Sequence, residues 1–343
     1  MLIPPHIVDK YWPFILLVAV FILLCATFLS LVHGALEIGI EDLWRWINGT
    51  GDSATNLVIE KLRFPRTLLA VAVGAVLAIS GAATQGLFRN PLADPSLVGV
   101  SAGATAGAAI VIVLLHQANT GIWGFTFVSL GAFAGSLAVV SFVYRLASSR
   151  SGTRVSTMLL AGLAFTFLAG SVTGLLEFFA DNEQLRRLSL WRMGGLDAAN
   201  VLSVTLMLLV GAICFSVLYV QKNALNVILL GESEARHLGI RVNLLKRSVI
   251  VCVAAGVGLA VALSGTIAFI GLIIPHGVRL IVGPNHRYLL PLSAIFGAVL
   301  LVFADTLSRT VIAPTELPVG LVTALIGAPV FISLLRNKHY ALQ

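Results

Sequence analysis

The feature of this sequence that most restricts its fold is a succession of apolar runs, each about as long as a bilayer is thick. A helix that crosses the hydrocarbon layer needs about 20 predominantly apolar residues. Runs of this kind lie at residues 14–33, 65–87, 96–115, 122–146, 155–179, 201–220, 245–263, 267–283, 289–307 and 318–335. They predict an all-α integral membrane protein of about ten transmembrane helices, with residues 1–343 forming a single transmembrane domain.

The composition excludes the main alternative class, a soluble globular domain. Of the 343 residues, 58% are apolar and only 11% are charged, which leaves too little polar surface for a water-soluble protein. The 32 glycines favour close helix packing within a membrane. The net charge of +7 does not indicate nucleic-acid binding, because the basic residues lie in short loops rather than in a stripe.

The distribution of basic residues predicts the orientation of the chain. Ten spans place both termini on one side of the membrane, and 14 of the 22 lysines and arginines fall on that side. Cytoplasmic loops carry the excess of these residues, so both termini are expected in the cytoplasm. The run at 14–33 lacks the pattern of a cleaved signal peptide and is interpreted as a retained helix.

A short internal echo suggests an inverted repeat. Ser80-Gly81 is followed by Pro91 at the same distance that separates Ser264-Gly265 from Pro275. The two motifs fall on spans that run in opposite directions, and inverted repeats are a recurrent transporter architecture.

The segment at residues 222–247 is the most informative predicted cytoplasmic loop. Its apolar spacing predicts two short amphipathic helices joined at Gly231. Such helices could lie on the membrane surface, or they could dock into a groove of a cytoplasmic partner.

Several motifs resemble the permease family of the bacterial ABC importers for iron-siderophores, haem and vitamin B12. The similarity covers about residues 57–336 and includes the Glu-Ala-x-x-x-Gly run of the 222–247 loop. It is carried by Arg63-Phe64-Pro65-Arg66, the runs at 86–95, 97–104 and 269–276, Asn285-His286-Arg287, Ala304-Asp305 with Arg309, Glu316-Leu317-Pro318-Val319-Gly320, and Gly327-Ala328-Pro329-Val330-Phe331.

This resemblance implies the type II importer fold, a ten-helix permease with inverted halves. It implies a homodimer, two cytoplasmic ATP-binding subunits, a periplasmic substrate-binding protein and a location in the bacterial inner membrane. Residues 222–247, called the coupling segment below, would transmit the motion of the ATPase. The positions that the resemblance assigns to this contact are Leu229, Gly231, Glu234, Ala235, Leu238 and Gly239.

The resemblance also implies two further groups of functional residues. Arg63, Arg66 and Arg309 would receive carboxylates of the binding protein; the alternative is that these arginines anchor helix ends at the lipid headgroups. Asn90 and Leu92 would narrow the pathway at the cytoplasmic end, with Ser156 at a second constriction. Asn90 before Pro91 could also be an ordinary helix stop.

The substrate is indicated by the run Ala180-Asp181-Asn182-Glu183-Gln184-Leu185-Arg186, which resembles the haem-transporting branch. A ferric siderophore or cobalamin remains the alternative. Haem is a flat apolar macrocycle with two propionates, so arginines at the mouth of a pathway suit it. Arg186, Arg187 and Arg192 are the candidate propionate contacts, and a mixed-charge helix cap is the structural alternative.

Histidines and cysteines give no metal or cofactor site. Three cysteines, Cys25, Cys214 and Cys252, are expected to be buried thiols that fill space in the core. His276 belongs to a family motif and is expected to be structural, whereas His116 lies at the predicted outer end of the third span and could touch haem.

Two other functional classes fit less well. An ion-coupled secondary transporter needs ionisable groups at mid-bilayer, and Glu177 and Asp305 lie near predicted span ends instead. An intramembrane enzyme could use Ser264 and His276, but no third orienting group accompanies them. The sequence has no phosphate-binding Gly-x-x-x-x-Gly-Lys loop, so ATP hydrolysis is expected in a separate subunit.

Overall fold

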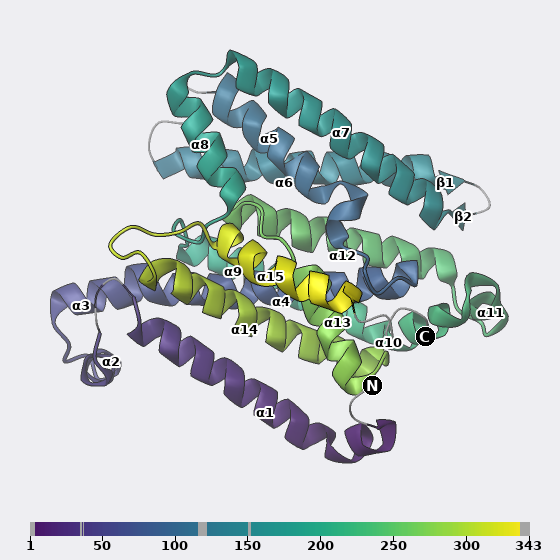
Figure 1. The fold of residues 1–343 in the computed structure, drawn as a ribbon, viewed down its shortest axis with the longest axis horizontal. Helices are drawn as coiled ribbons and strands as arrows, with labels where there is room; N and C mark the ends of the chain where they lie inside the picture. Colours follow the sequence, from purple (N-terminus) through teal and green to yellow (C-terminus); the bar gives the residue numbers. More distant parts are fainter. Residues whose placement is uncertain (1–3, 35, 37, 116–121, 150–151, 337–343) are drawn as a thin grey trace.

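A computed structural model describes residues 4–34, 36, 38–115, 122–149 and 152–336, and each predicted span corresponds to a helix (Figure 1). In the described residues, seven helical stretches are long and apolar enough to cross a bilayer, and α5, α13 and α15 are shorter apolar helices. The helices that correspond to the spans are α1 (Pro5–Val32), α4 (Phe64–Phe88), α5 (Val100–Leu114), α6 (Ile122–Ala147), α7 (Val155–Phe179), α9 (Val201–Val220), α12 (Val242–Ser264), α13 (Ile270–Val282), α14 (His286–Thr310) and α15 (Val319–Arg336). The fold class is therefore confirmed.

Two of the predicted spans are interrupted rather than continuous. The run at 96–115 divides at Gly99 into a short helix, η2 (Pro95–Val98), and α5, because Gly99 has a left-handed φ of 82°. The run at 267–283 contains α13, whose 13 residues reach about 20 Å, less than the hydrocarbon thickness. Phe269 before it has a φ of 70°, so irregular backbone precedes this helix inside the bundle.

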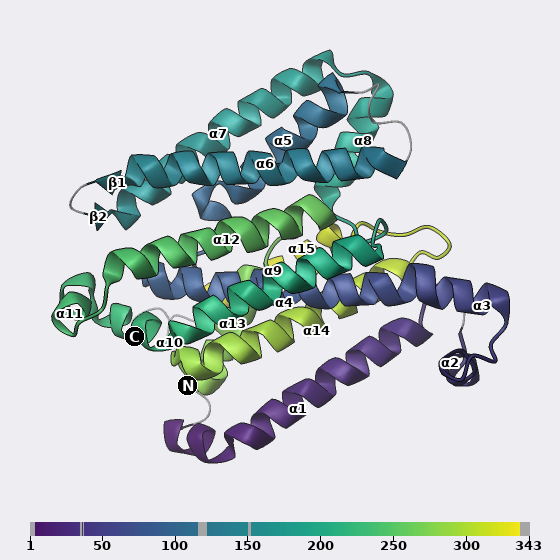
Figure 2. The same cartoon turned by 180° about the vertical axis from the view of Figure 1, so that it is seen from behind.

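The remaining elements lie at the two ends of the bundle (Figures 1 and 2). The end that carries α8 is called the α8 end below, and the end that carries α11 is called the α11 end. The start of α1 and the end of α15 both lie toward the α11 end. At the α8 end lie α2 (Ile40–Ile47), α3 (Ser53–Leu57), η1 (Val58–Arg63) and α8 (Asn182–Met193); at the α11 end lie β1 (Ser148–Ser149), β2 (Gly152–Thr153), α10 (Lys222–Val227), η4 (Ile228–Leu230) and α11 (Glu232–His237).

The centre of the bundle is α4, which is buried along most of its length and packs against α9, α12, α13 and α14. Glycines allow its backbone to approach its neighbours closely. A Cβ atom added at Gly81 would lie 1.8 Å from the carbonyl oxygen of Gly271, and one at Gly74 would lie 2.3 Å from that of Gly297. The close helix packing expected from the glycine content is confirmed at these crossings.

The two halves, α1 with α4–α7 and α9 with α12–α15, are related by inversion. In each half the second of the five span helices packs against the third and fourth span helices of the other half: α4 on α13 and α14, and α12 on α5 and α6. The short sequence echo is not part of this relation, because Ser80-Gly81 lies inside α4 while Ser264-Gly265 ends α12. The inverted repeat is therefore seen in the helix packing and not in the short sequence echo.

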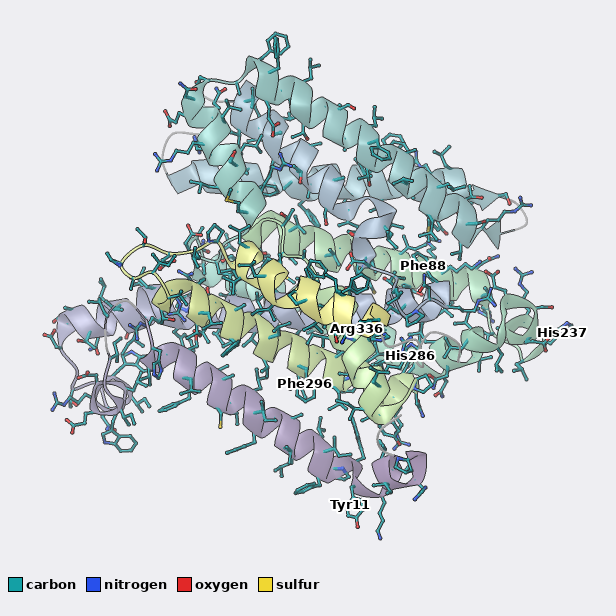
Figure 3. The ribbon with its side chains drawn as sticks, viewed as in Figure 1. Tyr11, Phe88, His237, His286, Phe296 and Arg336 are labelled. Carbon is teal, nitrogen blue, oxygen red and sulfur yellow. The ribbon has the colours of Figure 1, made fainter. Side chains whose placement is uncertain are left out.

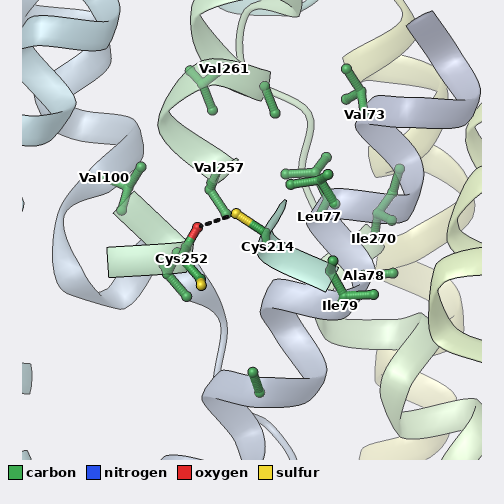
Figure 4. Packing of buried hydrophobic residues seen from close by; sticks show 14 of the residues in the cluster. Val73, Leu77, Ala78, Ile79, Val100, Cys214, Cys252, Val257, Val261 and Ile270 are labelled. Atoms are coloured by element: carbon green, nitrogen blue, oxygen red, sulfur yellow. Dashed lines mark hydrogen bonds between the residues drawn. The ribbon is translucent and has the colours of Figure 1, made fainter. Parts of the chain in front are cut away.

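The cysteine prediction is correct for two of the three thiols. Cys214 of α9 and Cys252 of α12 are buried, and the Cys214 thiol donates to the carbonyl oxygen of Cys252 over 3.5 Å (Figure 4). Cys25 is exposed on α1 instead of buried. This helix packs mainly against α14 and leaves most of its apolar surface uncovered, as a lipid-facing helix does.

Candidate functional site

The coupling segment contains the two short helices that the sequence predicts. They are α10, extended by η4, and α11, and they meet at Gly231, whose φ of 124° breaks the helical path. Figure 3 shows His237, the last residue of α11, at the extremity of the molecule. The segment therefore stands at the tip of the α11 end.

Buried contacts fix this segment to the long helices. Leu225, Ile228 and Ala235 are almost fully buried beneath it. The Asn226 amide oxygen accepts from the backbone N–H of His286 over 2.8 Å, which ties α10 to the start of α14. These contacts connect the coupling segment to the start of α14.

A second set of side chains in the coupling segment faces outward. Leu230 and Leu238 are 67% and 62% exposed, and Glu234 and Gly239 are also exposed. Leu229 and Gly231 are half-buried, and Ala235 points inward, so Ala235 supports the segment instead of forming its surface. Two exposed leucines on a structured tip form an apolar surface that suits a protein partner.

An ion cluster lies at the α8 end and joins α4 to α14. Asp305 pairs with two arginines: its Oδ1 accepts from Arg66 Nε over 2.8 Å, and its Oδ2 forms an ion pair with Arg309 Nε at 3.1 Å. Arg66 Nη1 also lies 2.7 Å from Glu316 Oε2, and Arg309 Nη2 donates to the Ser30 hydroxyl over 2.8 Å. These buried charges therefore have partners within the chain, as buried ions need.

The three arginines predicted to dock a binding protein are all at this end, but they are buried. The Arg63 guanidinium donates to the carbonyl oxygens of Leu31 and Val32 over 2.6 and 2.8 Å. The Arg66 and Arg309 side chains are only 10% and 5% exposed. The docking role stays a prediction, and Glu316, 40% exposed, is the member of the cluster that a partner would meet first.

A cavity of about 550 Å³ opens beside this cluster at the α8 end. Apolar groups from several helices form most of its wall, and Arg66, Arg187, Asp197 and Glu316 supply charge. The other lining residues are Ile112, Val128, Leu190, Trp191, Gly194, Gly195, Ala198, Leu263, Ser264, Gly265, Leu317, Pro318 and Val319. The cavity therefore combines a mostly apolar wall with a few charged groups, as small-molecule sites do.

Only one of the three candidate propionate contacts lines this cavity. Arg187 does, whereas Arg192 pairs with Glu177 over 2.8 Å and Arg186 is exposed. The structural alternative for this stretch also holds: Asp181 caps α8 by accepting from the Gln184 N–H over 2.8 Å, and the Gln184 side-chain oxygen accepts from the Asp181 N–H over 3.1 Å.

A second cavity, of about 530 Å³, lies at the α11 end. It is lined by Arg89, Gly152, Thr153, Arg154, Val155, Ser156, Leu159, Glu232 and Arg236. Ser156, one of the predicted constriction residues, is therefore part of it. Asn90 and Leu92 are exposed nearby in sequence but outside the lining, and the Asn90 side chain accepts from the Leu92 N–H over 2.9 Å as a turn does.

Sequence reasoning did not assign the three arginines of this second cavity to a site, because they lie far apart in the chain and only the fold brings them together. Of the histidines, His276 and His286 are buried and line neither cavity. His116 lies outside the described residues.

Comparison with known proteins shows what kind of bundle this is. The FecCD transport family model matches residues 22–337. The chain is 41% identical over 308 residues to the hemin transport system permease protein HmuU of Yersinia pestis, covering 89% of this chain and 90% of that protein. It is 43% identical over 283 residues to the cobalamin import system permease protein BtuC of Halobacterium salinarum, covering 82% and 74%.

A solved structure supports the same assignment. A metal-chelate type ABC transporter in an inward-facing conformation superposes with a TM-score of 0.82 at 32% identity, covering 94% of this chain and 99% of that one. The long matches in sequence and in fold agree with the motifs identified in the sequence. The chain therefore belongs to the FecCD transport family and is a permease subunit of an ABC transporter.

Proposed function

We propose that this permease imports haem across the bacterial inner membrane. The observation that carries the proposal is the cavity at the α8 end, where apolar walls that include Trp191 and Leu190 meet the guanidinium of Arg187. Burial of a flat apolar macrocycle against this wall would stabilise the bound state, and charge-assisted hydrogen bonds to arginine would stabilise its propionates. The same cavity therefore offers an apolar wall for the macrocycle of haem and an arginine for its propionates.

Similarity to known permeases does not distinguish between haem and cobalamin as the substrate. A hemin permease and a cobalamin permease are similar to this chain at nearly the same identity. The haem assignment therefore rests on Arg187 and the apolar wall, and on the resemblance of residues 180–186 to the haem branch. Cobalamin and a ferric siderophore are the alternatives that the experiment below includes.

The proposed machine takes its energy from separate subunits. Two ATP-binding subunits would contact the exposed leucines of the coupling segment, Leu230 and Leu238. The excess of lysine and arginine on that side supports a cytoplasmic α11 end. A periplasmic binding protein would deliver haem to the α8 end, and a second copy of the chain would complete the pathway.

Docking of the binding protein would use the ion cluster at the α8 end. In the isolated chain, the partly exposed carboxylate of Glu316 forms an ion pair with Arg66. A carboxylate of the incoming protein would replace it, and Arg63 and Arg309 would hold the supporting helices α1 and α14 in place.

Reconstitution in liposomes tests the proposal. The permease is assembled with its ATPase and its binding protein, and ATP hydrolysis is measured with haem, a ferric siderophore or cobalamin on the binding protein. We expect haem to stimulate hydrolysis and to accumulate inside, and Arg187→Gln to weaken this at least tenfold. Stimulation by cobalamin or the siderophore alone would replace haem as the substrate, and uptake driven by an ion gradient without ATP would contradict the importer itself.

A further inference from the structure

The cavities at the two ends of the bundle occupy equivalent places in the inverted halves. Each lies between the end of the second span helix and the start of the fifth span helix of one half: α12 and α15 at the α8 end, α4 and α7 at the α11 end. Their volumes are also similar, about 550 and 530 Å³. The inverted repeat therefore builds the same kind of cavity twice, once at each end.

The cavity at the α11 end carries an excess of positive charge. Arg89, Arg154 and Arg236 line it together with a single acid, Glu232. That acid is already engaged, since Glu232 Oε1 lies 2.6 Å from the Nζ atom of the buried Lys246. In the part of the chain that the structure describes, neither Arg89 nor Arg154 has an ion-pair partner.

Arg89 occupies a backbone position that an arginine rarely takes. It ends α4 in the left-handed region, with φ 51° and ψ 36°, where glycine or asparagine is usual. A non-glycine residue there costs about 1 kcal/mol of backbone strain. Its Nη1 atom lies 3.7 Å from the place of a Cβ on Gly231, so the guanidinium stands between the end of α4 and the coupling segment.

We propose that this cavity is a carboxylate-binding site on the exit route, which receives the propionates of the substrate after they leave the cavity at the α8 end. The inference rests on the proposed function. Unpaired arginines bind carboxylates through short charge-assisted hydrogen bonds, and Ser156, a predicted constriction residue, contributes to the same wall.

The coupling segment supplies two of the charged groups in this site. Glu232 and Arg236 both belong to α11, so a movement of α11 away from α7 removes one negative and one positive group from the cavity. The excess of positive charge from Arg89 and Arg154 is unchanged by this movement, but a bound carboxylate loses the hydrogen-bond donors of Arg236 and is held less tightly. Release of the substrate is in this way linked to the element that would contact the ATPase.

Cysteine protection tests the site without ATPase or transport. Ser156→Cys is placed in the full-length permease in phosphatidylcholine nanodiscs, and its rate of labelling by a membrane-impermeant maleimide is measured. Mesoporphyrin IX, a dicarboxylate, is compared with its dimethyl ester, which keeps the macrocycle but lacks the charges. We expect the dicarboxylate to slow labelling at least fivefold and the ester to have little effect.

Two further sets of variants make the result specific. Arg89→Gln with Arg154→Gln should abolish the protection, whereas the control pair Arg241→Gln with Arg247→Gln, exposed basic residues outside the lining, should leave it unchanged. Leu159→Cys, also in the lining, provides a second reporter if Ser156→Cys folds poorly.

Three results would overturn the site. They are equal protection by the ester, protection that survives loss of both arginines, and arginine-dependent protection by anionic phospholipid alone, which would make the cavity a lipid phosphate site. Lack of protection in a permease that still shows haem-stimulated ATP hydrolysis removes only this site. Protection without haem-stimulated hydrolysis removes only the proposed transport function.

Discussion

Glu232 of α11 and Lys246 of α12 form an ion pair, with 2.6 Å between Oε1 and Nζ, that joins the short helix α11 to the long helix α12. The Lys246 side chain is 2% exposed and also donates to the carbonyl oxygen of Thr153 over 2.5 Å. One buried ammonium thus holds α11, β2 and α12 together at the α11 end.

Replacing Lys246 with methionine should weaken the attachment of α11 to α12 while leaving the bundle folded. The change leaves Glu232 and the Thr153 carbonyl without their partner, at a local cost of about 2 kcal/mol. Substrate-stimulated ATP hydrolysis of the reconstituted complex should fall several-fold, and the control Arg247→Met, on an exposed neighbour, should not change it. Equal activity of the two variants would contradict a coupling role for this pair.

The ion cluster at the α8 end should make Asp305 indispensable for stability. Asp305→Asn removes the charge between two buried arginines, Arg66 and Arg309, and should cost about 3–5 kcal/mol. Thermal unfolding of the purified permease measures this. Glu316→Gln should cost clearly less because Glu316 is 40% exposed, so the opposite order of the two variants would contradict the cluster as described.

The crossing of α4 and α13 should not tolerate a methyl group at Gly81. A Cβ there would lie 1.8 Å from the carbonyl oxygen of Gly271, so Gly81→Ala must force the two helices apart. We expect loss of folded protein in size-exclusion chromatography. The matched control is Gly277→Ala on α13, where nothing lies within 4 Å, and that variant should be neutral or slightly more stable.

The exposed tip of the coupling segment should bind the ATPase through apolar contact. Leu238→Asp places a charge in that surface and should reduce binding of the ATPase at least tenfold without changing the stability of the permease. Tyr11→Asp, an exposed residue at the start of α1, is the control because Figure 3 shows Tyr11 well apart from His237 on α11. Unchanged binding of Leu238→Asp in a pull-down assay would contradict this contact.

The sequence was sufficient for the long helices because their lengths follow from the bilayer. The predicted span 201–220 has the bounds of α9, and 155–179 has those of α7. Short elements such as α2 and η1 were missed, since they are too short to cross a membrane and leave no long apolar run.

Site residues were harder to predict because their roles depend on side chains from distant helices. Arg66 could be placed at an outer helix end, but its burial depends on Asp305, more than 200 residues away in the chain. Arg89 lies in a family motif but could not be assigned to a cavity, since its left-handed backbone and its position against Gly231 exist only in the folded bundle. Arg186 and Arg187 are adjacent in sequence, yet only Arg187 faces the cavity, as helical geometry allows.

The most direct test of the account is the side of the membrane that the coupling segment faces. Leu238→Cys is labelled with a membrane-impermeant maleimide in sealed inside-out vesicles and in intact spheroplasts. Cys214 and Cys252 are buried, and Cys25 lies on the lipid-facing helix α1, so the parent chain provides the background. We predict labelling in inside-out vesicles alone, blocked by the ATPase subunit. Labelling from outside intact spheroplasts would contradict an ATP-driven importer with this architecture.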